Sequence, residues 1–96
     1  MLYELAKQLS DAGFPQGGAG TWSVPPDKIV SRREDRIYVP TLEELLEAVG
    51  PNFHYVLKLP HEWKAFGINS EVGRGQRPID AVARLWLEIN SRQRGA

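Results

Sequence analysis

The spacing of apolar residues along the chain predicts three helices. In segment 2–12 the apolar side chains recur at helical intervals, at Leu2, Leu5, Ala6 and Leu9. Segment 41–49 opens with Thr41 and Glu44, the two residues of a capping box. Segment 78–91 starts with a proline, which suits a first helical position, and its apolar face consists of Ile79, Val82, Ala83, Trp86 and Ile89. We therefore predict helices over 2–12, 41–49 and 78–91.

A second pattern, with a period of two, predicts a β-hairpin near residues 53–68. "FHYVLKLP" alternates apolar and polar positions, so we expect one buried face made of Phe53, Tyr55, Leu57 and Leu59. After a turn at 60–62, "WKAFGI" predicts the second strand. "RIYVP" predicts a strand near 36–39 that Pro40 stops, and a short strand over 21–24 is left open. Helix, strand, helix, hairpin and helix in this order indicate an α+β fold, with three helices packed on a small antiparallel sheet.

Two polar, glycine-containing segments are predicted to be loops. Segment 16–36 is long for a connection inside one domain, and such loops are often functional. "EVGRGQR" contains two glycines before the last helix, which raises the alternative of a phosphate-binding loop. It lacks the lysine and hydroxyl residue of a P-loop, and Pro78 removes one of the amides that would bind phosphate. We therefore interpret it as a solvated loop that leads into the helix.

Composition narrows the classes of function. The chain has 96 residues, which suits a single domain over 1–96, and twelve Lys and Arg balance twelve Asp and Glu. A balanced charge gives no overall field toward nucleic acid or membrane. The absence of cysteine excludes disulfides, thiol catalysis and cysteine-ligated zinc. Charges at Glu4, Lys7 and Asp11 do not fit a signal peptide or membrane span, so we expect a cytoplasmic protein.

Candidate catalytic and metal-binding groups are few. His54 and His61 are the only histidines, and they do not supply the three or more ligands of a metal site. The glutamates of segment 41–49 lie where a capping box and a solvated helix face need them. The serines have no nucleophile-elbow context. We expect no enzyme activity, no metal and no cofactor.

The residues best suited to bind a partner lie in the two predicted loops. Arginine and tryptophan are enriched among the residues that dominate binding energy. Trp22 lies between a glycine tract and two prolines, where it either pins the loop to the domain or serves as an exposed anchor. The partner-binding candidates are Trp22, Arg32, Arg33, Arg36, Arg74 and Arg77.

Three stretches of the chain carry a family resemblance. "LYELAKQLSDAGFPQ", "YVPTLEELLEAVG" and "PIDAVARLWLEIN" resemble, in this order, small uncharacterised proteins of phages, prophages and bacterial genomes. The arrangement is also similar to phage αβα-sandwich domains. These motifs are mostly caps and core positions, so the resemblance implies a fold rather than an activity. The chain departs from it at Arg77, where a threonine is usual, and in segment 16–36, which has the character of an insertion.

Small size and this resemblance together lead to an expected function. We expect a non-catalytic protein–protein interaction module of phage or mobile-element type, which binds a host or phage protein and inhibits a host defence protein. The alternative is a nucleic-acid-binding protein that uses Arg32, Arg33, Arg36, Arg74 and Arg77. The charges of Arg32, Arg33 and Arg36 are interrupted by Glu34 and Asp35, which favours the first interpretation.

Overall fold

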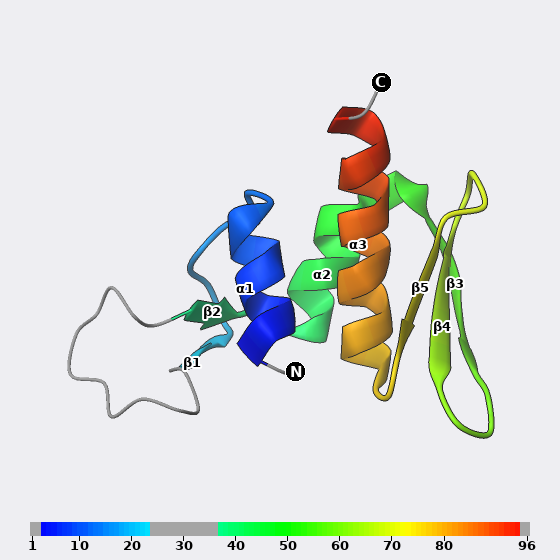
Figure 1. Ribbon diagram of the computed structural model, residues 1–96, viewed down its shortest axis with the longest axis horizontal. Coiled ribbons are helices and arrows are strands. Elements are labelled where there is room, and N and C mark those ends of the chain that lie inside the picture. The colour runs from blue at the N-terminus through cyan, green and yellow to red at the C-terminus, as the bar shows by residue number, and fades with distance from the viewer. Residues whose placement is uncertain (1–2, 24–36, 95–96) are drawn as a thin grey trace.

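The computed structural model describes residues 3–23 and 37–94, with side chains up to residue 91. The elements follow the chain as α1 (Tyr3–Asp11), β1 (Thr21–Ser23), β2 (Ile37–Val39), α2 (Leu42–Val49), η2 (Gly50–Asn52), β3 (Phe53–Lys58), β4 (Trp63–Gly67), β5 (Val72–Gly75) and α3 (Pro78–Arg94). The predicted α+β class is confirmed. In Figure 1 the helices lie between a small sheet, β1–β2, and a larger sheet, β3–β4–β5.

The predicted helices are confirmed at their core positions. On α1 the buried side chains are Leu5, Ala6 and Leu9. The capping box at the start of α2 is present, because the Thr41 hydroxyl accepts from Glu44 N and the Glu44 carboxylate accepts from Thr41 N. The long apolar face of α3 enters one core cluster with residues of α1 and α2.

The larger sheet has the order β3–β4–β5, and every pairing in it is antiparallel. Helix α3 packs mainly on β5 and β4, and only lightly on β3. This asymmetry is visible in Figure 1, where β5 lies nearest to α3. The helix is therefore displaced toward one edge of the sheet and leaves the other edge strand largely uncovered.

The prediction of a loop over "EVGRGQR" is wrong, because four of its residues form β5. Gly73 and Gly75 are buried and face α3, while Val72 and Arg74 face away from it. A Cβ atom at Gly73 would collide with backbone atoms of Ala81 and Leu85. Glycine in this strand therefore permits close approach of a helix, which is a recognised role for glycine in strands. Exposed and buried residues alternate in "VGRG" with the period of two of a strand, and the glycines occupy the positions that face α3.

The predicted strand near 36–39 is present at Ile37–Val39, but it does not extend the hairpin. It pairs with β1 in a separate two-stranded sheet, with Trp22 opposite Tyr38. The short strand that was left open near 21–24 is therefore present at Thr21–Ser23. Of the predicted loop 16–36, positions 24–36 lie outside the described residues.

The buried face predicted for residues 53–59 is also wrong. Phe53 packs against the core, but every later residue of β3 is exposed. The pairing explains the difference, because Phe53 pairs with Gly67 whereas Tyr55 pairs with the adjacent Phe66, across a bulge. Adjacent residues of a strand point to opposite faces, so the bulge puts Tyr55 on the face opposite Phe53. A bulge of this kind is not visible in the alternation of the sequence.

Candidate functional site

One face of the larger sheet carries no described helix. Pairing assigns six side chains to it, since cross-strand partners share a face: Tyr55 and Leu57 on β3, Lys64 and Phe66 on β4, and Val72 and Arg74 on β5. We call this set the open face. Helix α3 covers the opposite face, where Gly73 and Gly75 contact it. Tyr55 is 44% exposed and Leu57 is 42% exposed, so large apolar groups of this face meet solvent.

The two aromatic rings of the open face stack on each other. The ring centroids of Tyr55 and Phe66 are 4.6 Å apart, and their planes differ by 19°. Because each ring turns one face toward its neighbour, that face is not available to a ligand. Such a surface suits apolar contact with side chains better than stacking with flat bases.

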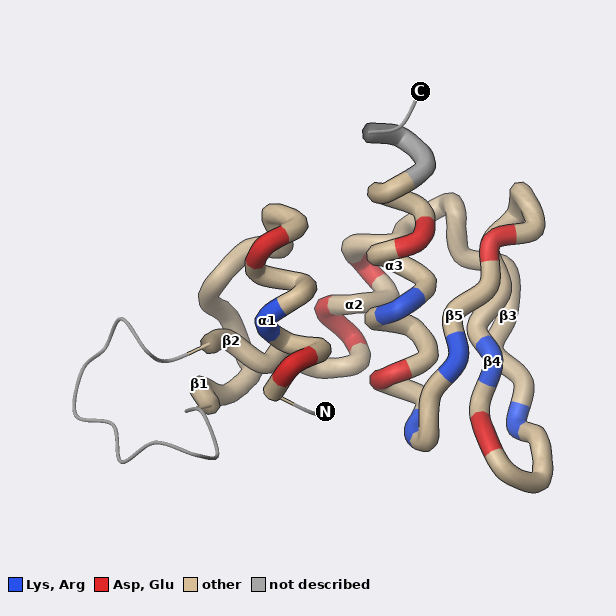
Figure 2. The backbone as a smooth tube through the Cα atoms, viewed as in Figure 1, with Lys and Arg blue, Asp and Glu red and all other residues tan. Residues whose placement is uncertain are grey.

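Two cations lie opposite each other on the open face, on β4 and β5. Lys64 pairs in register with Arg74, and like charges in that position oppose strand pairing. Glu62 offsets part of this repulsion, because its Oε1 lies 3.8 Å from Arg74 Nε. The six open-face positions include no carboxylate. Figure 2 shows these basic positions side by side on β4 and β5. An incoming carboxylate would therefore be stabilised here.

Trp22 lies on the other side of the helices, on β1. Its ring contacts Tyr38 edge-on, with 5.4 Å between centroids, yet the side chain remains exposed. Trp22 is thus both attached to the domain and accessible, and the two alternatives considered for it are compatible.

A partly buried hydrogen-bond network holds the Tyr38 hydroxyl in place. The Tyr38 hydroxyl lies 2.7 Å from Glu44 Oε1 and 2.8 Å from Oε2, and it accepts from Gly20 N at 2.7 Å. Burial raises the pKa of Tyr38, and the neighbouring Glu44 raises this pKa further. The Thr41 backbone N–H lowers the pKa of Glu44, and the Tyr38 hydroxyl adds to this effect. The network joins the glycine tract, β2 and the start of α2.

The predicted binding residues do not form one surface. Arg74 lies on the open face, and Arg77 is exposed just before α3. Figure 1 shows β1, which carries Trp22, and β5 on opposite sides of the helices. Arg32, Arg33 and Arg36 lie outside the described residues. The roles of these residues in binding stay predictions, but Trp22 and Arg74 cannot contact one small ligand together.

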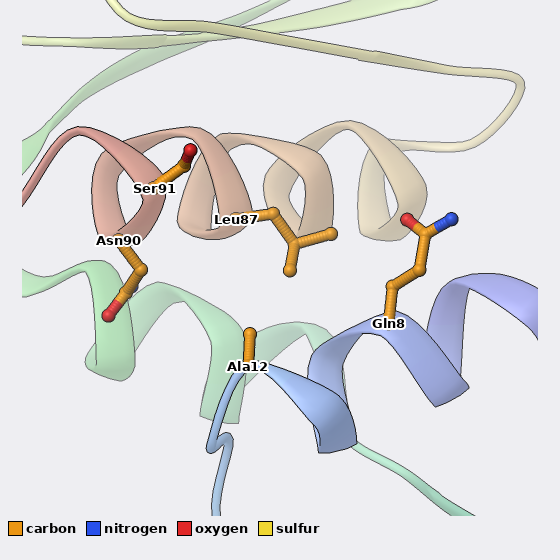
Figure 3. A pocket seen from close by; sticks show the side chains of 5 residues that line it. All are labelled: Gln8, Ala12, Leu87, Asn90 and Ser91. Carbon is orange, nitrogen blue, oxygen red and sulfur yellow. The ribbon is translucent and has the colours of Figure 1, made fainter. Parts of the chain in front are cut away.

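A shallow pocket of 380 Å³ lies between α1 and α3 (Figure 3). Its lining residues are Gln8, Ala12, Leu87, Asn90 and Ser91. The Asn90 amide already donates to the Trp86 carbonyl at 2.9 Å. None of the five lining residues has an ionisable carboxylate, amine or imidazole, so the pocket offers no acid–base pair.

Residues 3–23 and 37–94 contain neither a metal-binding cluster nor a membrane-spanning helix. In these ranges no three acidic or histidine side chains gather where they would hold a metal ion. None of the helices there is both long and apolar enough to cross a membrane. Comparison with known proteins found no matching family model, curated protein or solved structure. The resemblance to phage proteins therefore stays a prediction.

The open face is the feature that the sequence interpretation missed. The alternation of residues 53–59 predicts Tyr55 and Leu57 in the core, and the glycines of "EVGRGQR" predict a loop at Val72. One signal was present in the sequence: glycines at every second position of "VGRG" leave Val72 and Arg74 together on the other side of a strand.

Proposed function

We propose that this protein is a non-catalytic protein–protein interaction module that binds its partner over the open face. The observation that carries the proposal is the exposure of Tyr55, Leu57 and Val72 together on an uncovered sheet face. Contiguous apolar groups surrounded by polar ones are typical of protein interaction sites. The flanking Lys64 and Arg74 add an electrostatic preference, which sets partner choice and orientation.

The narrower expectations are part of the same proposal. We infer that the partner is a host or phage protein and that binding inhibits a host defence protein, as small size and the sequence resemblance suggest. We also place the protein in the cytoplasm, where a chain without cysteine needs no disulfide. Binding through Trp22, Arg74 and Arg77 remains an additional prediction.

A capture experiment with matched variants tests the proposal. The tagged full chain is incubated with host lysate, and bound proteins are quantified for the parent, Leu57→Asp, Trp22→Ala and Arg74→Ala/Arg77→Ala. Leu57→Asp should stay folded, because Leu57 is exposed, and should lose a partner that the parent retains. Retention of every partner by Leu57→Asp would exclude the open face. Loss in Trp22→Ala alone would move the binding surface to β1.

A further inference from the structure

Strand β3 is exposed on three sides. Within the described part of the chain it pairs only with β4, so its outer edge has no strand partner. Tyr55 and Leu57 are exposed on the open face, and Val56 is exposed on the face that α3 barely reaches. The other edge strand of this sheet is better protected, because Arg84 Nη1 donates to the Arg74 carbonyl at 2.6 Å.

Protection of the β3 edge is confined to its ends. Sheet edges avoid unwanted pairing through bulges, lysine and proline. The bulge lies between Phe53 and Tyr55 at one end, and Lys58 and Pro60 lie at the other. The three residues between, Tyr55 to Leu57, are apolar and carry none of these features. A free edge with an apolar centre is the arrangement to which an extended peptide adds in strand addition.

The side chains next to this edge specify what an added strand would contain. Alternate residues of the incoming strand would lie beside Tyr55 and Leu57 on the open face, where β-branched or aromatic groups pack best. On the other face its residues would lie beside Val56 and Lys58. The Lys58 ammonium lies 5.8 Å from the centre of the Trp63 ring and remains exposed, so a carboxylate fits next to it.

Charge also argues against a second copy of this chain as the added strand. An antiparallel pairing of β3 with itself, centred on Val56, would set Lys58 opposite His54 and offer it no carboxylate. Both copies would also bring Lys64 and Arg74 to the joined sheet, which would increase its positive charge. A partner segment that combines apolar side chains with a carboxylate has neither disadvantage.

We propose that β3 accepts one more strand, an extended segment of the partner protein that alternates β-branched residues and carries a carboxylate beside Lys58. This inference rests on the proposed function and adds the chemistry of the partner. Main-chain hydrogen bonds to the β3 edge supply affinity, while the carboxylate and the apolar side chains supply specificity.

The test uses random linear peptides displayed on phage and selected on the immobilised full chain. Selected peptides are resynthesised and their affinities measured for the parent, Val56→Lys and Val72→Lys. These variants are closely matched, because Val56 is 37% exposed and Val72 is 38% exposed, on opposite edge strands of one sheet. We expect Val56→Lys to weaken binding about tenfold or more, because lysine on the edge opposes strand addition. Val72→Lys lies on the open face but two strands away from the β3 edge, so it should weaken binding by a much smaller factor.

A charge exchange makes the result independent of how well Val56→Lys folds. Lys58→Glu should weaken the acidic peptides, and replacing the peptide's carboxylate with lysine should restore their binding to that variant. Amide exchange measured by NMR should slow along residues 53–58 when a peptide binds.

The outcomes separate strand addition from the proposed function. Peptides that respond to Val72→Lys but not to Val56→Lys would overturn strand addition and leave binding over the open face intact. Peptides indifferent to both variants, or a library that yields no binder, would also overturn strand addition. The capture experiment with Leu57→Asp then decides the proposed function by itself.

Discussion

Glu44 accepts two kinds of hydrogen bond at once, and this combination gives a prediction about pH. Its carboxylate caps α2 through Thr41 N and also receives the Tyr38 hydroxyl. These bonds lower the pKa of Glu44 in the folded chain relative to its ordinary value of 4.5. The folded state therefore binds this proton less readily than the unfolded state, and the resulting stability is fully present above the unfolded pKa.

The stability from Glu44 should be lost as the pH falls below about 4.5 and through the lower pKa of the folded state. Urea unfolding of the parent and Glu44→Gln across this range measures it. The parent should be the more stable at neutral pH, and the difference should shrink in acid. Glu43→Gln, an exposed change in the same helical turn, should cost much less at neutral pH. A parent advantage that stays constant with pH would contradict the linkage.

The same residues show what a sequence can and cannot predict at this scale. The capping box follows from Thr41 and Glu44 at their spacing, because both partners lie within one helical turn. The bond between Tyr38 and Glu44 could not be predicted, because it depends on how β2 meets the start of α2. Gly20 belongs to the same arrangement, since a Cβ atom there would collide with Tyr38 and the Val39 carbonyl.

At the scale of elements, the contact between β5 and α3 depends on the absence of a side chain at Gly73. An added methyl group would meet helix backbone, which cannot move aside as a flexible side chain can. We expect Gly73→Ala to lower the free energy of unfolding by about 1–3 kcal/mol, the usual cost of overpacking. Urea denaturation measures the loss. Val72→Ala, an exposed change in the same strand, is the control and should cost less.

Equal stabilities for Gly73→Ala and Val72→Ala would mean that the helix does not lie this close to β5. The contact also explains why a local interpretation of the sequence favoured a loop. Glycine lowers strand propensity by itself, and only the approach of α3 makes it the suitable residue. Helix predictions were more accurate, because their signals lie within one element, whereas the strand β5 is stabilised by partners elsewhere in the chain.

At the scale of the whole molecule, the packing of Phe14 on Trp86 joins the segment that follows α1 to the last helix. The ring centroids are 5.0 Å apart in an edge-to-face arrangement, and Trp86 is only 8% exposed. We expect Trp86→Ala to cost about 3–5 kcal/mol through loss of packing and the cavity left behind. Trp22→Ala is the matched control, because Trp22 is 52% exposed and should cost far less. Similar losses for the two variants in urea denaturation would contradict this core.

The distribution of basic and acidic residues over the molecule bears on the nucleic-acid alternative. Figure 2 shows the described basic positions distributed over α1, the larger sheet and α3, with acidic positions between them. A nucleic-acid surface needs cations that follow a backbone of phosphates, usually with aromatic faces for the bases. On the open face Lys64 and Arg74 stand together, but the Tyr55 and Phe66 rings stack on each other.

We therefore expect no binding of single-stranded DNA or RNA oligomers at micromolar protein and low salt, measured by fluorescence anisotropy. Phosphate contacts release condensed counterions, so true binding would weaken steeply as salt increases. Salt-sensitive binding that Arg74→Ala/Arg77→Ala abolishes would make nucleic acid the ligand of the surface that carries Arg74 and Arg77. Salt-sensitive binding that survives this double substitution would depend on other cations, and Arg32, Arg33 and Arg36 would be the next residues to replace. Absence of binding in every titration leaves an apolar protein segment as the ligand that best matches the exposed edge of β3.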